Sequence, residues 1–458
     1  MATLPRRDLL RLSLAGLAVA MARPIAACGA PLVSPGGADS GGDAVSPPPA
    51  DAGLEASPID AAPPTDGARP GDANAPDAAD ASSPDSADAA DAATDAADAA
   101  DAAPTPLKSN IANLGPLEPP DANNLRLPPG FTSRVVATTG QLPVATSTYR
   151  WHVAPDGGAV YAAPGGEWVY VSNAEANPGG VGALRFNAAG DVVDAYPILA
   201  GTSTNCAGGR TPWGTWLSCE EHARGRVFEC DPMGVGAAEA RPALGVFRHE
   251  AASVDPVRGQ LYLSEDEPDG RFYRFTPAAM GMGGALDLTA GTLEVARVVA
   301  GAVTWLPVPD PELTGPTATR HQVPASTVFN GGEGLWYHAG KVYLATKGDD
   351  RVWEYDIVAS TIREHYNHLT AANPILRAVD NLTGSAGGDI LVAEDGDDLQ
   401  IVAILPDGSL KAIVQVVNHP GSEVTGPAFD PSGTRLYFSS QRAPGGAVTF
   451  EVTGPFHV

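Results

Sequence analysis

The sequence predicts an all-β protein: a six-bladed β-propeller at residues 107–458, preceded by a signal peptide at 1–27 and a disordered tether at 28–106. Three observations support this prediction. Short apolar segments that end in polar or acidic residues recur six times, their spacing is nearly constant, and the first hundred residues contain few bulky apolar side chains. A repeat of short strands with a period in the mid-forties is typical of a propeller, in which each sheet buries its faces against its neighbours.

Residues 1–27 have the features of an export signal. Arg6 and Arg7 precede the apolar run LLRLSLAGLAVA, which is too short to span a membrane stably. The adjacent arginines indicate the twin-arginine route, and the sequence IAAC, which ends at Cys28, is typical of a lipobox. A plain secretory signal with an incidental cysteine is the alternative. We therefore expect an exported protein that is lipid-anchored through Cys28 in the periplasm or at the cell surface.

The segment up to residue 106 consists almost entirely of Ala, Asp, Pro, Gly and Ser. It buries too little apolar surface to offset its ordering entropy, so we expect a flexible tether that spans roughly 50 Å. Short Ala-rich helical turns are the alternative. Beyond the tether, 38 acidic and 23 basic residues give a formal charge of −15. This excess argues against nucleic acid as a partner and is compatible with bound cations; we expect a monomer.

The six repeated segments are the cores of the predicted blades. Their third apolar positions are separated by 46, 46, 81, 48 and 46 residues, so one interval, which includes Pro277 to Phe329, holds an insertion. Alternating segments such as RVFEC and RFYRF follow the cores and predict further half-buried strands. The cores are WVYVSNAE (168–175), TWLSCEE (215–221), QLYLSEDE (260–267), KVYLATKGD (341–349), DILVAEDGD (389–397) and RLYFSSQR (435–442).

Two sets of polar side chains are expected to converge on the mouth of the propeller channel, because the innermost strand of a blade begins where the second strand ends. The first set lies nine to eleven residues before each core and comprises residues 156–158, Cys206, Glu250, Glu333, and Asp380 with Asn381. The second set lies at strand ends and comprises Asn173, Glu175, Glu220, Glu221, Glu265, Asp266, Lys347, Glu394, Asp395 and Arg442.

This crowd of acids predicts bound metal ions. Two negative charges 4 Å apart repel by about 4 kcal/mol at an effective dielectric near 20, and a fold is stable by only about 5–15 kcal/mol. Carboxylates suit calcium, magnesium or manganese, whereas a thiolate suits iron or zinc. Any single acid is equally compatible with a solvated strand end. The predicted ligands are Cys206, Glu220, Glu221, Glu250, Glu265, Asp266, Glu333, Asp380, Asn381, Glu394 and Asp395.

The cysteines and histidines allow more than one interpretation. Cys219 and Cys230 flank a short turn and are able to pair in an oxidising compartment, which leaves Cys206 as either a metal ligand or an inert buried thiol. His249, beside Glu250, either orients a ligand or is simply packed. The sequence contains no Gly-x-Ser-x-Gly elbow, P-loop or His-Glu-x-x-His motif, so these enzyme classes lack support.

The chain resembles the PhoX-type alkaline phosphatase family from about residue 125 to its end. The similar segments include NCAGGRTPWGTWLSCEE, FRHEAASVDP, FNGGEGLWYHAGKVYLATKGDDRVWEYD, VDNLTGSAGGDILVAEDGDD and GPAFDPSGTRLYFSSQR, and LPPGFTSRVVA is similar to the family's opening strand. The resemblance implies an exported six-bladed propeller with an iron (Fe³⁺) and calcium cluster. It also implies that Cys206 binds iron, that Glu250 and Glu333 are further ligands, and that Asp380, Glu394 and Asp395 hold calcium.

We therefore predict a metal-dependent phosphomonoester hydrolase. The predicted catalytic residues are Glu250, Glu333, Lys347 and Arg442, with the two cations, aided by Arg210 or Arg248, holding the substrate's anion. A calcium-dependent lactonase of the gluconolactonase kind is an alternative, which the thiol of Cys206 disfavours. The second alternative is a non-catalytic surface lipoprotein that binds metal.

Overall fold

The computed structural model describes residues 107–396 and 398–458, so the predicted signal peptide, Cys28 and the tether lie outside the described residues. The described part is all-β, with short 3-10 helices and no α-helix. It contains no helix long and apolar enough to cross a bilayer. The 3-10 helices are η1 (Ile111–Asn113), η2 (Pro164–Gly166), η3 (Pro242–Leu244), η4 (Met282–Gly284), η5 (Thr319–His321) and η6 (Lys347–Asp349).

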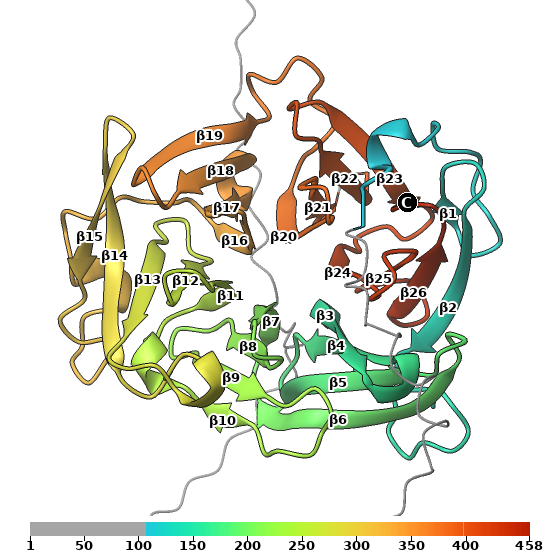
Figure 1. Cartoon of the computed structure of the whole chain (residues 1–458), viewed down its shortest axis with the longest axis horizontal. Coiled ribbons are helices and arrows are strands. Elements are labelled where there is room, and N and C mark those ends of the chain that lie inside the picture. The colour runs from blue at the N-terminus through green and yellow to red at the C-terminus, as the bar shows by residue number, and fades with distance from the viewer. Residues whose placement is uncertain (1–106, 397) are drawn as a thin grey trace, which may run out of the picture. The chain divides into compact units, whose positions relative to one another are not determined.

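The strands form antiparallel sheets arranged radially, as in a β-propeller (Figure 1). Three sheets have four strands each: β3 (Pro155–Ala163), β4 (Glu167–Ala174), β5 (Gly179–Phe186) and β6 (Val192–Thr202); β7 (Asn205–Arg210), β8 (Trp216–Glu220), β9 (Val227–Cys230) and β10 (Glu239–Ala240); and β24 (Val424–Phe429), β25 (Arg435–Ser440), β26 (Val448–Thr453) and β2 (Thr132–Thr138).

Two sheets are larger. One has five strands: β20 (Val379–Gly384), β21 (Ile390–Glu394), β22 (Gln400–Ile404), β23 (Leu410–Val416) and β1 (Leu125–Arg126). The other has nine: β11 (His249–Asp255), β12 (Gln260–Glu265), β13 (Phe272–Pro277), β14 (Gly291–Val299), β15 (Ala302–Pro307), β19 (Thr361–Asn367), β18 (Arg351–Asp356), β17 (Lys341–Thr346) and β16 (Gly332–His338).

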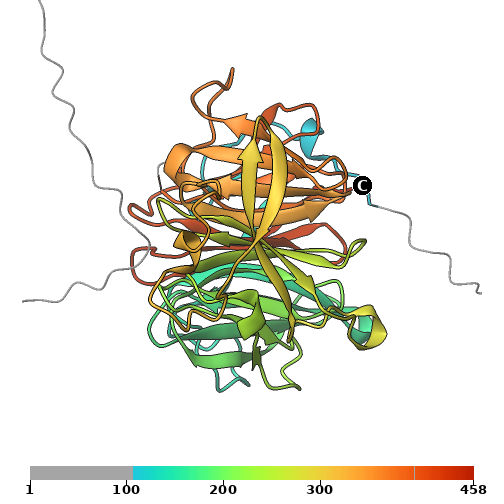
Figure 2. The same cartoon turned by 90° about the vertical axis from the view of Figure 1, so that its left-hand side faces the viewer.

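The nine-stranded sheet corrects the prediction of six separate sheets, because hydrogen bonding in the described chain yields five. Its two halves are joined only through β15, where Ala302 pairs with Thr361 of β19. β14 and β15 come from the predicted insertion between Pro277 and Phe329, and they lie on the outer surface that faces the viewer in Figure 2. The insertion thus supplies an extra strand that links two neighbouring units.

Six strands of the described chain surround the central axis. The innermost strands β3, β7, β11, β16, β20 and β24 contact one another in sequence, and β24 closes the ring on β3 (Figure 1). The ring is also closed by hydrogen bonds, because β2, from the N-terminal part, pairs with β26, from the C-terminal part. The six predicted cores are β4, β8, β12, β17, β21 and β25, each paired with an innermost strand.

Apolar side chains of neighbouring sheets pack against each other and form the core. Leu217 of β8 and Leu263 of β12, for example, are fully buried in one cluster, and Tyr170 of β4 stacks on Tyr437 of β25 with ring centroids 5.4 Å apart. A buried side chain of this size stabilises the fold by about 1.5–3 kcal/mol. These inter-sheet contacts hold the innermost strands at fixed distances from one another.

Candidate metal centre

Every innermost strand carries a β-bulge at the same place in its pairing with the second strand. The bulges lie between Pro155 and Gly158, Asn205 and Gly208, His249 and Ala252, Gly332 and Leu335, Val379 and Leu382, and Thr425 and Ala428. A bulge inserts an unpaired residue and redirects its side chain. The first bulge residues are Asp156, Cys206, Glu250, Glu333, Asp380 and Gly426. One local distortion, repeated around the axis, therefore presents four carboxyl groups and one thiol.

A second layer of acids comes from the residues that follow β4, β8 and β21. Glu175, Glu221 and Asp395 stand directly after these strands, beside the bulges of the partner strands. The sixth bulge residue is Gly426, which has no side chain to offer; there Glu423, just before β24, supplies the carboxyl group. The mouth of the channel thus receives side chains from both strands of several hairpins.

These side chains form four overlapping groups, and within each group the potential ligand atoms lie within 4.8 Å of one another. Neighbouring groups share Cys206, Glu250 or Asp380, so the groups form one continuous arc, which we call the acid arc. The groups are Asp156, Glu175 and Cys206; Cys206, Glu221 and Glu250; Glu250, Glu333 and Asp380; and Asp380, Asp395 and Glu423. Eight of the nine residues are buried, and Asp395 is partly buried.

Glu250 shows most clearly that the arc fits multivalent cations. Its side chain is fully buried, and neither carboxyl oxygen has a hydrogen-bond partner in the structure. Burial, together with the negative charges of Glu333 and Glu221, raises the pKa of Glu250 well above its ordinary value. A buried, unsatisfied carboxylate is costly unless a cation compensates its charge. Glu250 therefore either binds a proton or ligates a metal ion.

The same cause acts on other members of the acid arc. Burial, followed by the charges of Glu175 and Asp380, raises the pKa of Asp156 well above its ordinary value. Burial also raises the pKa of Asp380, although the ammonium group of Lys347 acts in the opposite direction. The carboxyl groups of the arc consequently become fully ionised only when positive charge is added.

Among the described residues, three cationic side chains contact the acid arc. Nζ of Lys347 lies 2.9 Å from Oε1 of Glu333 and 3.1 Å from Oδ2 of Asp380. A guanidinium nitrogen of Arg442 lies 2.9 Å from Oε2 of Glu423.

The third cation is Arg248, one of whose nitrogens lies 3.0 Å from Oε1 of Glu221. The side chain of Arg442 is 40% exposed, so it is able to reach both the arc and a bound molecule. Together, the three cations place positive charge at the rim of an acidic site.

The structure places three predicted ligands away from the arc. Glu220, Glu265 and Glu394 each precede a second-layer position by one residue, so in an extended strand their side chains point to the opposite face. Glu220 accepts hydrogen bonds from the backbone of Ser203 at 3.0 Å and Arg226 at 3.2 Å. Its carboxyl group therefore stabilises loops.

Glu394 and Glu265 have comparable roles. Glu394 accepts hydrogen bonds from the backbone N–H groups of Arg377 at 3.0 Å and Gln400 at 2.9 Å. Glu265 accepts from the hydroxyl of Tyr273 at 2.7 Å and pairs with Arg320 at 3.3 Å. Burial raises the pKa of Glu265 to about 7. Both carboxyl groups connect a strand end to a neighbouring segment.

Asp266 and Asn381 also lie outside the four groups. Asn381 donates a hydrogen bond to Oδ1 of Asp380 at 2.8 Å and accepts one from the backbone of Gly426 at 2.7 Å. It therefore orients Asp380 and joins β20 to β24. Asp266 follows β12 directly, as Glu221 follows β8, but its blade offers no third acid within the same distance.

Sequence reasoning left three members of the acid arc out of the predicted ligand set. Asp156 and Glu175 were expected at the channel mouth but not as ligands. Glu423 was not expected at all, because it lies twelve residues before Arg435, just outside the spacing used for the other blades. A sequence signal identifies all three residues. Each is an acid that lies next to the start or the end of one of the repeated hairpins when the six hairpins are aligned with one another.

The structure decides between alternatives that the sequence left open for the cysteines and for His249. Cys219 lies opposite Val227, and Cys230 lies opposite Trp216, so the two thiols belong to opposite faces of the sheet and are not bonded to each other. Burial lowers the pKa of His249 to about 3, and the neutral ring packs 3.6 Å, centroid to centroid, from Phe247. Its role is packing, whereas Arg248 is the neighbour that contacts the arc.

Glycines keep the innermost strands close together around the arc. A Cβ atom on Gly209 would lie 1.9 Å from the carbonyl oxygen of Ala252, and one on Gly334 would lie 2.3 Å from the backbone nitrogen of Leu382. Such contacts are sterically impossible, so only glycine allows β7 to approach β11, and β16 to approach β20, this closely. The small size of these residues keeps the ligands of neighbouring strands within reach of each other.

The fold and the site together define a β-propeller with a candidate multimetal centre at one end of its channel. The family model that matches the chain is Alkaline phosphatase PhoX, over residues 163–227 and 222–374. The resemblance to the PhoX-type alkaline phosphatases is thereby confirmed for these residues, which include Cys206, Glu250 and Glu333. No curated protein sequence matches the chain.

Solved structures with a similar fold include PhoX from Pseudomonas fluorescens in complex with vanadate, a transition state analogue. It is 18% identical, has a TM-score of 0.62, and the match covers 74% of this chain and 98% of that one. A protein of unknown function from Bacteroides thetaiotaomicron is 8% identical, with coverages of 70% and 76% and a TM-score of 0.46. The gluconolactonase XC5397 from Xanthomonas campestris is 12% identical, with coverages of 76% and 97% and a TM-score of 0.42.

Proposed function

We propose that this chain is a metal-dependent phosphomonoesterase of the PhoX type, in which a six-bladed propeller holds iron and calcium in the acid arc. The observation that carries the proposal is the fully buried Glu250, whose unsatisfied carboxyl oxygens lie at the centre of a continuous set of potential ligands. The match to the PhoX family model includes this residue. The vanadate bound by the Pseudomonas fluorescens protein supports a phosphate-like substrate for this chain as well.

The donor atoms suggest how two kinds of metal divide the arc. The two groups that contain Cys206 combine a thiol with carboxyl groups, a set that suits iron. The groups of Glu250, Glu333 and Asp380, and of Asp380, Asp395 and Glu423, offer only oxygen, which suits calcium. Multivalent cations bound there supply positive charge that stabilises a phosphoryl group and activates water for attack on phosphorus.

The side chains of the chain have distinct roles in this proposal. Glu250 and Glu333 would hold metal ions of the centre that acts on the phosphoryl group. Lys347 and Arg442, and with them Arg248, bind the oxygens of the substrate and neutralise the charge that develops during transfer. Arg210 has no such role, because it ends β7, at the opposite end of the strand from Cys206.

The compartment and the anchor complete the proposal. We infer that residues 1–27 direct export by the twin-arginine route, and that a lipid on Cys28 and the acidic tether hold a monomeric propeller in the periplasm or at the cell surface. Support comes from the sequence alone, in the paired arginines and the lipobox. Mass spectrometry of the membrane-extracted protein tests this part, since an unmodified Cys28 would contradict it.

The enzymatic proposal is tested with purified protein loaded with iron and calcium and assayed with a chromogenic phosphomonoester. Glu250→Gln removes a charged ligand without changing its size and is expected to abolish turnover. Glu239→Gln is the matched control, because the Glu239 carboxyl group is largely exposed and pairs with Arg241 at the surface. Equal rates for native protein and Glu250→Gln would overturn the proposal, and metal-loaded protein without turnover would favour the non-catalytic metal-binding alternative.

A further inference from the structure

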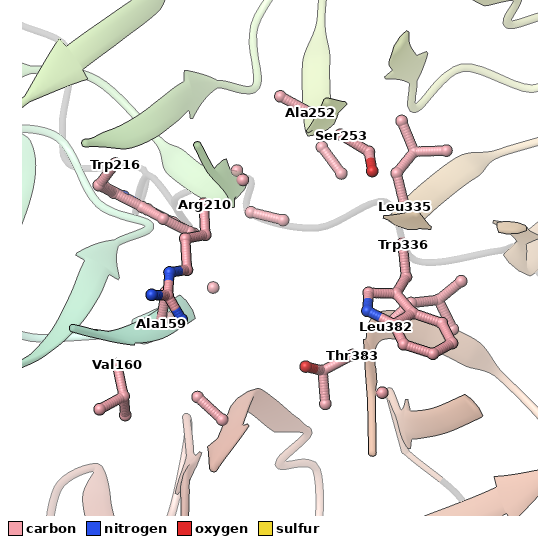
Figure 3. Close-up of a pocket in the computed structure, with 18 of the residues that line it drawn as sticks. Ala159, Val160, Arg210, Trp216, Ala252, Ser253, Leu335, Trp336, Leu382 and Thr383 are labelled. Atoms are coloured by element: carbon pink, nitrogen blue, oxygen red, sulfur yellow. The ribbon is translucent and has the colours of Figure 1, made fainter. Parts of the chain in front are cut away.

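A cavity with a volume of about 610 Å³ lies in the propeller channel and extends from residues next to the acid arc, such as Gly157 and Ala207, to the opposite ends of the innermost strands, where Arg210 lies. The innermost strands run from their bulges toward this end, and the cavity is lined by the residues that follow the bulges (Figure 3). Small-molecule sites in proteins commonly have volumes of about 300–1,000 Å³ and mostly apolar walls with a few convergent polar groups. This cavity, which we call the rear cavity, falls within this range of volumes, and both polar and apolar groups contribute to its walls.

Arg210 is the cation of the rear cavity. Its guanidinium group lies 5.1 Å from the ring centroid of Tyr161, which holds it at the cavity wall. Within residues 107–396 and 398–458, no carboxyl group lies within ion-pair distance of Arg210, whereas Lys347, Arg248 and Arg442 each have at least one such partner. In a propeller with an excess of acids, a cation without a carboxylate partner is available to an anion from solution.

Other donors face the same space. Ser253, Thr383 and the indole of Trp336 line the cavity. In Figure 3 the hydroxyl oxygen of Thr383 and the indole nitrogen of Trp336 point toward its centre. No side-chain hydrogen bond to another described residue engages these two groups. A guanidinium, an indole N–H and two hydroxyls form a set rich in donors, which recognises a ligand rich in acceptors.

Most of the other lining residues are small or apolar, although Asn381 and Asp430 also contribute to the walls. Glycines and alanines such as Gly208, Gly209 and Ala252 line the cavity, and so does the ring of Trp336, which stacks on Tyr343. A flat ring system packs well between small residues and an indole face. The guanidinium group of Arg210 is then available to bind the acidic end of such a molecule.

We propose that the rear cavity binds a small organic anion with a flat, largely apolar body. Its acidic group pairs with Arg210, its ring system packs beside Trp336, and its polar edge bonds to Thr383 and Ser253. The residues that contact this ligand lie nearer the strand ends opposite to the acid arc, so the proposal does not require the proposed phosphatase activity.

The probe for the test is anilinonaphthalene sulfonate, a flat aromatic anion whose fluorescence rises on binding. Native, metal-loaded protein is expected to bind it saturably. Arg210→Gln is expected to weaken binding about tenfold, the effect of losing one charge-assisted hydrogen bond, and Arg210→Lys to restore part of it. Thr383→Trp fills the cavity and is expected to abolish binding. Arg297→Gln, on the exposed face of β14, is the matched control and leaves binding unchanged.

Metal content and near-ultraviolet circular dichroism of each variant show that the fold is retained. Phosphatase turnover of Arg210→Gln is expected to equal that of the native protein, because Arg210 lies away from the arc. Absence of saturable binding by the native protein would overturn the proposal. Equal affinity of the native protein, Arg210→Gln and Thr383→Trp would also overturn it, because the probe would then bind elsewhere.

Discussion

Nζ of Lys347 lies 2.9 Å from Oε1 of Glu333, and the same ammonium group is 3.3 Å from Oδ2 of Asp395. Lys347 follows β17 at the position that acids hold after β4, β8 and β21. One unit of the ring thus presents a cation where four others present a carboxyl group and the sixth presents Gln441. This exchange gives the acidic mouth a place where a negatively charged phosphoryl group is attracted.

Replacement of Lys347 tests this role. Lys347→Gln is expected to lower kcat/KM for a phosphomonoester by about 10²–10³-fold, because a preorganised positive charge near the transferred group is lost. Lys341→Gln is the control, since Lys341 pairs with Glu354 away from the mouth. Steady-state kinetics at known metal occupancy makes the measurement. An unchanged kcat/KM at full occupancy would show that Lys347 does not act on the substrate.

Substitution of Glu250 should have opposite effects on the stability of metal-free and metal-loaded protein. In the metal-free form Glu250→Gln removes a buried group that resists ionisation, so we expect a higher melting temperature at pH 8. In the loaded form it removes a ligand, and we expect a lower one. In each form, the substitution is expected to change the free energy of unfolding by about 0.5–3 kcal/mol. Calorimetry with and without chelator checks both signs, and a decrease in both forms would contradict the interpretation.

Metal-free protein should also become more stable on acidification from pH 8 to pH 6. Burial raises the folded-state pKa values of Glu250, Asp156 and Asp380 above their ordinary values, so the folded state binds more protons than the unfolded state in this range. The free energy of unfolding therefore falls as the pH rises above the ordinary pKa values of carboxyl groups. The decrease is up to about 1.4 kcal/mol per pH unit for each such group.

Thermal unfolding of chelated protein at both pH values makes this measurement. The dependence should weaken in Glu250→Gln and in metal-loaded protein, because neither holds the same uncompensated carboxyl groups. A melting temperature of the chelated native protein that rises between pH 6 and pH 8 would show that these carboxyl groups do not control its stability.

Glycine packing beside the arc gives a further test. Gly209→Ala would place a Cβ atom 1.9 Å from the carbonyl oxygen of Ala252, so β7 and β11 must separate. We expect a loss of stability of about 1–3 kcal/mol or more, together with weaker metal binding by Cys206 and Glu250. Gly236→Ala, whose added atom would be 3.5 Å from its nearest neighbour, is the control. Normal metal affinity in Gly209→Ala would mean that strand spacing does not set the ligand positions.

The sequence predicted much of the arc because the hairpin between the first and second strands has a nearly constant length. Counting back from each core therefore located Cys206, Glu250, Glu333 and Asp380. The repeated bulge was not evident, since a bulge depends on pairing between strands rather than on composition. Glu423 was missed for this reason: the sixth bulge residue is Gly426, and the carboxyl group comes from a different backbone position.

The second layer was harder to predict because two acids often stand side by side. In Glu220–Glu221 and Glu394–Asp395, alternation along the strand sends only the second side chain to the channel. The register needed to decide between them is fixed by tertiary pairing. The link between β15 and β19 was equally hidden, because a single bridging pair leaves no pattern in the sequence.

The central claim is that multivalent cations compensate the charges of the acid arc, and the metal content of the purified protein tests it most directly. Elemental analysis is expected to find both iron and calcium in the native chain, with iron lost and calcium largely kept in Cys206→Ser. Cys219→Ser, at a buried thiol outside the arc, should keep both metals. Native protein that binds no multivalent metal, even when refolded with iron and calcium, would contradict the account.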